Sequence, residues 1–336
     1  PILKLAGRSP GPKPERWLDD PPTLRIILPG GCWVKSDAGI SMAVALGFFA
    51  AVALLLGDLI VSGEGRIASH AQGDAVRSFS YLRSFGFGEL RAGNLPLWNP
   101  HLFSGTPFLG SFQASMLYPP AWIHLVVPVA VGINLELAFS LWVLCLGTFF
   151  WARSQALSIP AALLCATMVG FGATASLRVL AGALTVLASY AWVPWLMCCI
   201  DALVRRVTLG WLLVTTGAAA MLLLAGHPPT AFMSAFVLAL YALPAILRAE
   251  EKPRLFASLA GAGLLALGIA GLQLALGYDV TIESIRRAGV DFDFATSWSF
   301  PPENLLTLAV PSLFGEATAT GIDYFGRWGY WDDVAF

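Results

Sequence analysis

The sequence predicts an all-α integral membrane protein, a polytopic helical bundle with about seven transmembrane helices and a large first outer loop. Of its 336 residues, 57% are hydrophobic and only 12% are charged, whereas soluble domains average about 25% charged residues. The mean hydropathy is +0.71, and apolar runs of membrane length follow one another along the chain. Because isolated strands would leave backbone groups unpaired in lipid, these runs are expected to be helices.

The composition also limits the function classes. The net charge of −1, without a basic patch, gives no indication of a nucleic-acid partner. The five cysteines lie in the N-terminal tail or in apolar runs. The sequence therefore predicts neither a disulfide framework nor a zinc site built from cysteines.

The first 39 residues precede the first apolar run. They lack the charged segment, short apolar stretch and cleavage site that together mark a signal peptide. We interpret residues 1–39 as a cytoplasmic, partly disordered N-terminal tail.

Seven apolar runs are long enough to cross the membrane, since spanning about 30 Å of hydrocarbon takes about 20 residues. Residues 121–131 are too short for this and are interpreted as an interfacial helix or as the entry into the second span. The predicted spans are 40–61, 133–152, 158–176, 179–200, 209–225, 230–247 and 255–276.

The Lys and Arg residues of the short loops indicate the orientation. With the N-terminus inside, the cytoplasmic side collects the tail and most basic residues of the short turns. The short outer turns then hold only Arg178 and the uncharged segment 226–229. The outer loop, 63–120, and the segment 277–336 are then extracytoplasmic. We expect the chain to be truncated before further spans.

The outer loop begins with a candidate catalytic residue, Asp74. After it, apolar side chains recur every three residues, which predicts an amphipathic helix on the membrane surface. Asp74 is then either the N-cap of this helix or a functional carboxylate, acting as a general base or a metal ligand. One residue can do both. The recurring apolar residues are Val76, Phe79, Leu82 and Phe85.

The middle of the outer loop is rich in Pro, Gly and Asn at turn positions. It is either a rigid connector anchored at the interface by Trp98, or a cleft that presents a stacking face and amide groups to a sugar. The cleft residues would be Trp98, Asn99, His101 and Gln113. His101 and His124 have no second ligand at helical spacing, so we interpret them as interfacial hydrogen-bonding residues rather than metal ligands.

Other polar residues lie near the predicted span ends. Glu136 is a functional candidate because intramembrane acids are costly, although simple solvation explains it as well. His227 lies in a His-Pro-Pro turn and either shapes that turn or contacts a substrate. Arg286 and Arg287, after the last span, either bind a lipid phosphate bidentately or make ordinary headgroup contacts.

Several distinctive strings of residues occur together in this chain. They are Gly73-Asp74, RAGNLPLWNPHLFSGTPF, QASMLYPP, SYAWVPWLMCCIDALVRR, LLAGHPPTAF and SWSFPPENLLTLAVPSLFG. From residue 73 onward these strings resemble the YfhO family of bacterial membrane proteins. One departure is Pro229, where the family often has Gln, and this weakens a sugar contact by that turn. The family is usually longer, with more spans after the point where this chain stops.

The resemblance implies a fold like the GT-C class of glycosyltransferases over residues 40–276, in the bacterial cytoplasmic (inner) membrane. Those enzymes carry an essential aspartate in the first outer loop, and Asp74 matches its position. The implied reaction moves a sugar from a polyprenyl-phosphate donor to an envelope polymer or lipid acceptor on the outer face. The candidate substrate-binding residues are Trp98, Asn99, His101, Gln113, His227, Arg286 and Arg287.

The main requirement of such a reaction is that the protein positions the donor and the acceptor. The donor already carries a good leaving group, so the protein must align an acceptor hydroxyl, accept its proton and offset the charge left on the phosphate. Asp74 can perform the first two tasks. Arginines, or a divalent cation such as Mg²⁺ or Mn²⁺, can perform the third.

Two other classes remain open. A lipid-linked-sugar flippase or transporter predicts broken helices and charges near the bilayer midplane, for which Pro194 is a weak indication. A non-catalytic envelope assembly factor, whose outer loop binds a partner, predicts that function survives Asp74→Asn.

Overall fold

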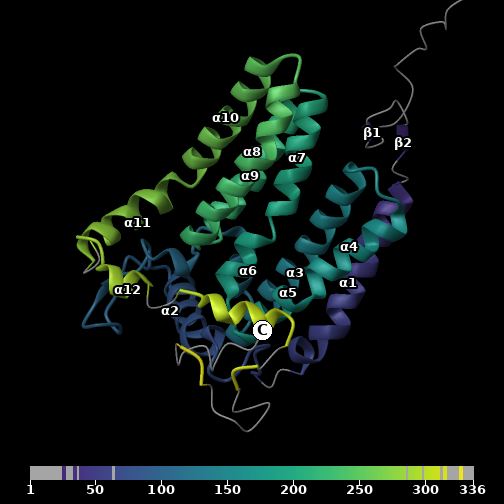
Figure 1. Cartoon of the computed structure of the whole chain (residues 1–336). Coiled ribbons are helices and arrows are strands. Elements are labelled where there is room, and N and C mark those ends of the chain that lie inside the picture. The colour runs from purple at the N-terminus through teal and green to yellow at the C-terminus, as the bar shows by residue number, and fades with distance from the viewer. Residues whose placement is uncertain are drawn as a thin grey trace, which may run out of the picture.

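The computed structural model is almost entirely helical in the parts of the chain that it describes (Figure 1). Two short strands, β1 (Arg25–Ile27) and β2 (Trp33–Lys35), pair antiparallel ahead of the first helix. The rest of the predicted tail before Ala38 lies outside the described residues. The structure describes residues 25–27, 33–35, 38–62, 65–284, 287–296, 299–310, 313–315 and 325–327.

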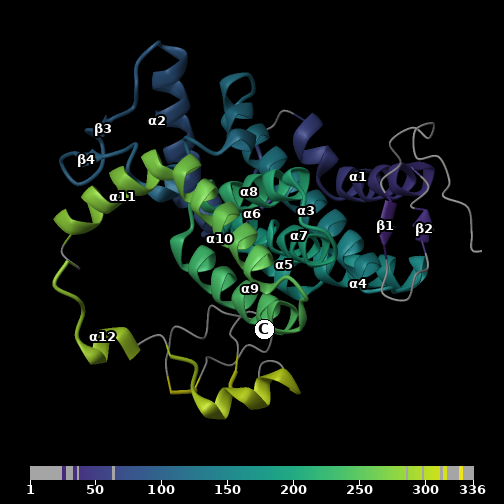
Figure 2. The same cartoon turned by 90° about the horizontal axis from the view of Figure 1, so that it is seen from above.

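The main helices form one bundle in which α3 is central. It packs against α1, α4, α6 and α7, while α8 packs against α7 and α10. Figure 2 shows α3 and α6–α8 enclosed by the other helices. Their bounds are α1 (Ala38–Val61), α3 (Val129–Ser154), α4 (Ile159–Phe171), α5 (Ala173–Leu180), α6 (Leu184–Tyr190), α7 (Val193–Arg205), α8 (Leu209–Leu224), α9 (Pro228–Arg248), α10 (Lys252–Ile269) and α11 (Gly271–Glu283).

Five helical segments of the described chain are long and apolar enough to cross a membrane, so the chain is a helical membrane protein. A sixth candidate is the pair α10 and α11, which is bent by 67° at its junction. The described chain thus has five candidate spans, or six with the bent pair, where the sequence predicted seven. The predicted span 209–225 corresponds to α8, an apolar helix of only 16 residues. The five segments are Gly39–Val61, Val129–Ser154, Ile159–Leu180, Leu184–Arg205 and Pro228–Arg248.

Small residues let the helices approach closely, as is common where lipid removes the hydrophobic drive between helices. A Cβ atom on Gly147 of α3 would lie 2.5 Å from Cδ1 of Trp195 on α7. The indole Nε1 of Trp195 donates to the carbonyl of Val143, at 2.8 Å. A polar group of one helix is thus paired by the backbone of its neighbour, which fixes the contact between α3 and α7.

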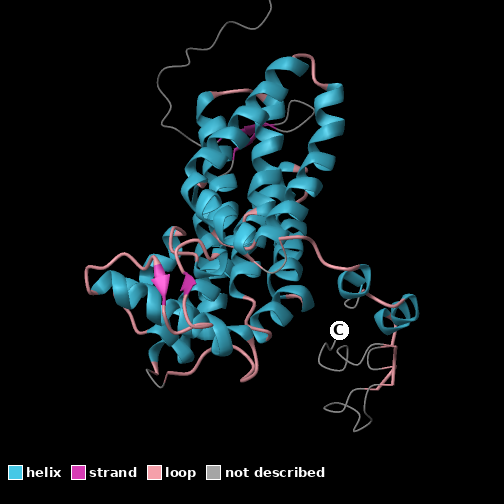
Figure 3. Ribbon diagram, turned by 90° about the vertical axis from the view of Figure 1, so that its left-hand side faces the viewer, coloured by secondary structure: helices cyan, strands magenta, loops and turns pink. Residues whose placement is uncertain are grey.

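The predicted outer loop folds into a compact unit at one end of the bundle, and we call residues 65–128 the cap (Figure 3). Its strands pair antiparallel, with Trp98 opposite Pro107 and Asn99 opposite Thr106. The cap contains the π-helix η1 (Ala75–Phe79), α2 (Ser80–Arg91), β3 (Trp98–Asn99), β4 (Thr106–Pro107) and the 3₁₀ helices η2 (Phe112–Ala114) and η3 (Pro119–Leu125).

The cap is held to the bundle by an apolar core of its own. Phe87, Phe108 and Tyr118 from the cap pack with Leu224 at the end of α8 and Ala270 at the bend between α10 and α11. Burying one such aromatic side chain stabilises a fold by about 1.5–3 kcal/mol. The middle of the loop is therefore a folded layer over the helix ends.

The amphipathic helix predicted after Asp74 is present, but its buried face is displaced from the predicted one. Ala75, Phe79, Arg83 and Phe87 are buried at four-residue spacing, so that an arginine lies on the apolar face. The predicted face residues other than Phe79 are only half-buried.

Several boundaries differ from the sequence prediction. The predicted span 158–176 is divided at Gly172 between α4 and α5, and the predicted span 179–200 begins within α5 and continues as α6 and α7 to Arg205. Residues 121–131 divide between η3 and the first turn of α3, which begins at Val129, because Pro128 stands at its N-cap and ends the preceding turn. The predicted span 255–276 is interrupted at Ala270, and α11 continues to Glu283, so polar residues prolong the helix beyond the apolar run. Beyond it lie α12 (Phe292–Thr296) and η4 (Pro302–Leu308).

Candidate functional site in the cap

A buried ion pair joins the cap to the central helix. Arg83 on α2 and Glu136 on α3 have side chains that are each 1% exposed. The guanidinium donates twice to the carboxylate, from Nε to Oε1 at 2.9 Å and from Nη2 to Oε2 at 3.2 Å. This bidentate geometry is what offsets the cost of removing both charges from water. Solvation, the simpler interpretation of Glu136, is therefore wrong.

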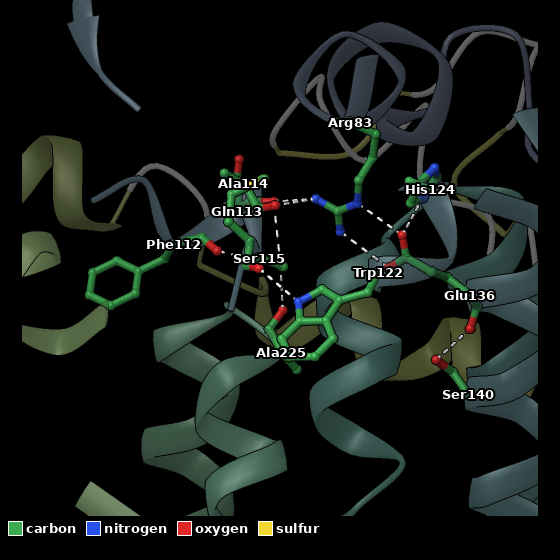
Figure 4. A network of polar contacts seen from close by, with 11 residues as sticks. Arg83, Phe112, Gln113, Ala114, Ser115, Trp122, His124, Glu136, Ser140 and Ala225 are labelled. Atoms are coloured by element: carbon green, nitrogen blue, oxygen red, sulfur yellow. Dashed lines mark hydrogen bonds and ion pairs between the residues drawn. The ribbon is translucent and has the colours of Figure 1, made fainter. Parts of the chain in front are cut away.

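The same guanidinium fixes the backbone of η2 (Figure 4). Nη1 of Arg83 donates to the carbonyls of Ala114, at 2.6 Å, and Gln113, at 3.2 Å. The indole of Trp122 donates to the carbonyl of Met116, at 3.1 Å. Arg83 thus positions a loop segment through main-chain contacts that do not depend on the side chains of that segment.

His124 completes this network. Its Nε2 lies 2.6 Å from Oε1 of Glu136, and its ring stacks on Phe87 at a centroid distance of 5.3 Å. Because the carboxylate is the acceptor, we assign a proton to Nε2. The buried Nδ1 has no hydrogen-bond partner within the described residues. The prediction that His124 acts as a hydrogen-bonding residue fits this geometry, but the ring is fully buried.

The η2 segment also contacts the turn between α8 and α9. Ser115 donates through Oγ to the carbonyl of Ala225, at 2.9 Å. Gly226 has φ +88°, and a Cβ there would lie 2.1 Å from the carbonyl oxygen of Phe112. Only glycine fits this approach, because the left-handed backbone and the close contact coincide.

His227 follows this turn and caps α9. Its Nδ1 accepts from the backbone N–H of Thr230, at 3.2 Å, and lies 2.7 Å from the Thr230 hydroxyl. Burial lowers the pKa of His227 below its ordinary value, and the positive charge of Arg178 on α5 lowers it further. Both effects favour the neutral form of the imidazole, and the side chain of Arg178 is exposed.

Asp74 stands on a fixed backbone with an exposed side chain. Its N–H donates to the carbonyl of Ala181, at 2.9 Å. Gly182, with φ +70°, lies so close that a Cβ there would be 2.4 Å from the nitrogen of Ala75. Asp74 stands at the N-cap position of the helix that follows, as one interpretation predicted, but its carboxylate makes no capping bond there.

The predicted cleft residues of the β3–β4 hairpin lie apart from Asp74. Trp98 is exposed and its ring lies against Gly105. Asn99 is buried, and its Oδ1 accepts from the N–H of His101, at 2.9 Å, so this oxygen shapes a turn. His101 packs edge-on against Phe85, at 5.8 Å. Phe85 lies eleven residues, or about 16 Å of helix, beyond Asp74.

The other predicted substrate-binding residues do not all lie in one region of the structure. Gln113 has an exposed side chain on η2, the segment that contacts the turn of His227. Arg287 lies in an exposed turn after α11, and Figure 1 shows α11 diverging from the bundle. Arg286 lies outside the described residues. The structure therefore brings Gln113 and His227 to one region and does not connect Arg287 with it.

Arg83 is the residue that local sequence patterns left unassigned. The sequence does contain an indication of its role, because Arg83 lies four residues from both Phe79 and Phe87 and so interrupts an apolar helix face. An ion-pair partner on another helix cannot be read from that spacing, because Glu136 is 53 residues away in the chain.

The described residues contain no group of three or more His, Cys, Asp or Glu side chains that could hold a metal ion. The fold and this site define the class as a helical membrane protein with a folded cap over one end of its bundle. No protein-family model, curated protein or solved structure matches the chain.

Proposed function

We propose that this protein is a membrane glycosyltransferase, similar to the YfhO family and the GT-C class, that moves a sugar from a polyprenyl-phosphate donor to a cell-envelope acceptor. The observation that carries the proposal is the state of Asp74. Its backbone is fixed against the turn between α5 and α6, while its carboxylate is exposed and makes no capping bond. A carboxylate held in this way is available for chemistry.

In the proposed step, an acceptor hydroxyl attacks the anomeric carbon of the donor sugar. The new carbon–oxygen bond forms as the bond from the anomeric carbon to the phosphate oxygen breaks, and the polyprenyl phosphate leaves with that electron pair. Asp74 takes up the proton of the hydroxyl as general base. Much of the rate comes from holding the two substrates in line.

The leaving phosphate requires positive charge, which we assign to Arg178. This arginine lies on α5, three residues before Ala181, whose carbonyl holds the backbone of Asp74. It is also close enough to His227 to lower the pKa of that imidazole. A neutral His227 can hydrogen-bond to a sugar without competing for the phosphate. A divalent cation such as Mg²⁺ or Mn²⁺ is an alternative source of charge.

The proposal includes the finer topology. The N-terminus faces the cytoplasm of a bacterial cell and the cap lies on the outer face of the inner membrane. In this arrangement the five long apolar segments, α8 and the bent pair α10–α11 make seven crossings. The cap then meets lipid-linked donors at the membrane surface, where a lipid tail holds them.

The test is Asp74→Asn in the full-length protein. We expect normal expression and insertion, an unchanged melting temperature, because no capping bond is lost, and glycosyl transfer reduced at least about a hundredfold. Transfer from a radiolabelled lipid-linked sugar into envelope material measures it. Asp58→Asn is the matched control, since Asp58 is an exposed aspartate near the C-terminal end of α1, the end that leads into the cap. Glycosyl transfer by the Asp58→Asn protein should stay near that of the wild type.

A lipid-linked-sugar transporter is the second candidate, favoured by the 67° bend between α10 and α11, because interrupted helices are typical of transporter sites. Reconstituted vesicles distinguish the two functions. Movement of a lipid-linked sugar between leaflets, insensitive to Asp74→Asn and without transfer to an acceptor, would support the transporter. Normal envelope assembly in the Asn variant, with neither activity, would instead favour a non-catalytic assembly factor.

A further inference from the structure

The bend between α10 and α11 is an interruption in an apolar helix pair, with only Ala270 between the two helices. Interrupted helices in membrane proteins occur where the backbone is buried in protein or lines a cavity. This bend lies under the cap, because Ala270 and Leu274 pack with Phe108 and with Leu224 of α8. The interruption therefore faces the cap.

Gln273 lies in the first turn of α11, immediately after the bend. The residue is 3% exposed, and neither its Nε2 nor its Oε1 has a hydrogen-bond partner among the described residues. A side-chain amide offers two donor hydrogens and an acceptor oxygen. Leaving the amide nitrogen and the amide oxygen of Gln273 unpaired in a buried position is destabilising. A bound ligand could supply the missing hydrogen-bond partners.

Helix geometry gives the direction of this side chain. Ala270, Gln273 and Gly277 share one face of the helix, and the neighbours on that face contact the cap. A Cβ on Gly277 would lie 2.2 Å from Cζ of Phe112. Since helical side chains lean toward the N-terminus of their helix, the amide of Gln273 is directed toward the bend on the face of α11 that contacts the cap.

We propose that the bend and the cap segment Phe112–Ala114 form a subsite for the sugar of a lipid-linked substrate, with Gln273 as its specificity-determining residue. Neighbouring sugar hydroxyls can donate to Oε1 and accept from Nε2 at once. The neighbouring residues along the helix, Ala270, Leu274 and Gly277, carry no charge, which favours a neutral hydroxylated ligand over a phosphate. This inference rests on the proposed function.

The subsite adjoins the region assigned to the reaction. The cap segment that contacts α11 at Gly277 also contacts the turn of His227, because the carbonyl of Phe112 lies against Gly226. Arg83 fixes the same segment through the carbonyls of Gln113 and Ala114. A sugar bound at Gln273 would thus lie beside the cap segment that Arg83 positions.

The experiment measures thermal unfolding of the full chain in nanodiscs. The probes are polyprenyl-phosphate-linked glucose, polyprenyl phosphate alone, and free glucose, galactose and N-acetylglucosamine. We expect the wild type to be stabilised by at least one free sugar and, beyond the effect of polyprenyl phosphate, by the linked glucose. Gln273→Met and Gln273→Leu, of similar size, should raise the melting temperature without ligand by a few degrees and weaken the apparent sugar affinity at least about tenfold.

Thr216→Val is the matched control, because Thr216 on α8 also has a buried hydroxyl without a partner in the described chain. It should raise the melting temperature and keep the response to sugar. A sugar response that survives in both Gln273 variants, or its absence from the wild type, would overturn the subsite. Stabilisation by polyprenyl phosphate alone that these variants abolish would assign the amide to the phosphate, which also overturns it.

The Asp74→Asn protein separates this proposal from the proposed function. Its sugar response should equal that of the wild type, since binding does not require proton transfer. A sugar response that depends on Gln273, in a protein without any transfer activity, would keep the subsite and reject the glycosyltransferase. Transfer activity that depends on Asp74, together with a sugar response that does not depend on Gln273, would keep the glycosyltransferase and reject the subsite.

Discussion

At the scale of single residues, this protein has one buried charge pair, whose disruption is costly, and one exposed carboxylate that makes no capping bond. Arg83 and Glu136 are buried and fully paired, so they set the geometry of the cap. Asp74 has a fixed backbone and an exposed side chain. The contrast agrees with a positioning role for the buried pair and with the chemical role proposed for Asp74.

Breaking the buried pair should be strongly destabilising. Glu136→Gln leaves the guanidinium of Arg83 buried without its countercharge, which should lower the free energy of unfolding by about 3–5 kcal/mol. The melting temperature in detergent should fall accordingly. Arg83→Met combined with Glu136→Leu should recover much of the loss, because no charge then stays buried.

Glu251→Gln is the control for that measurement. Glu251 forms an exposed pair with Arg254, at 2.9 Å, and such pairs contribute at most about 1 kcal/mol. A similar fall in melting temperature for Glu136→Gln and Glu251→Gln would show that the buried pair is not a structural anchor.

At the scale of elements, close approaches at glycines decide how the cap meets the bundle. Gly132, in the first turn of α3, lies against the imidazole of His124, where a Cβ would be 2.3 Å from Nδ1. Gly226 and Gly182 admit the cap backbone in the same way. The cap therefore packs on α3, the α5–α6 turn and the α8–α9 turn through contacts in which a methyl group does not fit.

Gly132→Ala should push His124 away from Glu136 and lower the stability by about 1–3 kcal/mol, the usual cost of overpacking. Gly88→Ala, on α2, is the opposite control. A Cβ there meets no atom within 4 Å, so the change should stabilise the helix by about 0.5–1 kcal/mol. Melting temperatures shifted in the same direction in both variants would contradict the contact at His124.

At the scale of the whole molecule, the bundle has two different ends. One end is covered by the cap, and the opposite end is closed by short turns such as the one between α9 and α10. The basic residues of the short loops lie mostly at the opposite end, including Arg248 and Lys252. This distribution supports the proposed orientation, in which the positive-inside rule turns this end toward the cytoplasm.

Cysteine labelling tests that orientation in a background whose native cysteines are replaced by alanine. Asn94→Cys lies at an exposed site of the cap and should react with a membrane-impermeant reagent in intact cells. Glu250→Cys, exposed in the turn between α9 and α10, should react only after lysis. The reverse pattern would invert the topology and remove the cap from the outer face.

The sequence by itself determined the class of the protein, the order of its apolar helices and the position of Asp74 just after the first of them, because hydropathy and helical length are local properties. It did not determine the folding of residues 65–128 into a cap, the interruption at Ala270 or the exposure of Asp74. Nor did it pair Arg83 with Glu136 and His124, or leave the amide of Gln273 without a partner. These features depend on which side chains meet across the fold, so only the tertiary structure decided them.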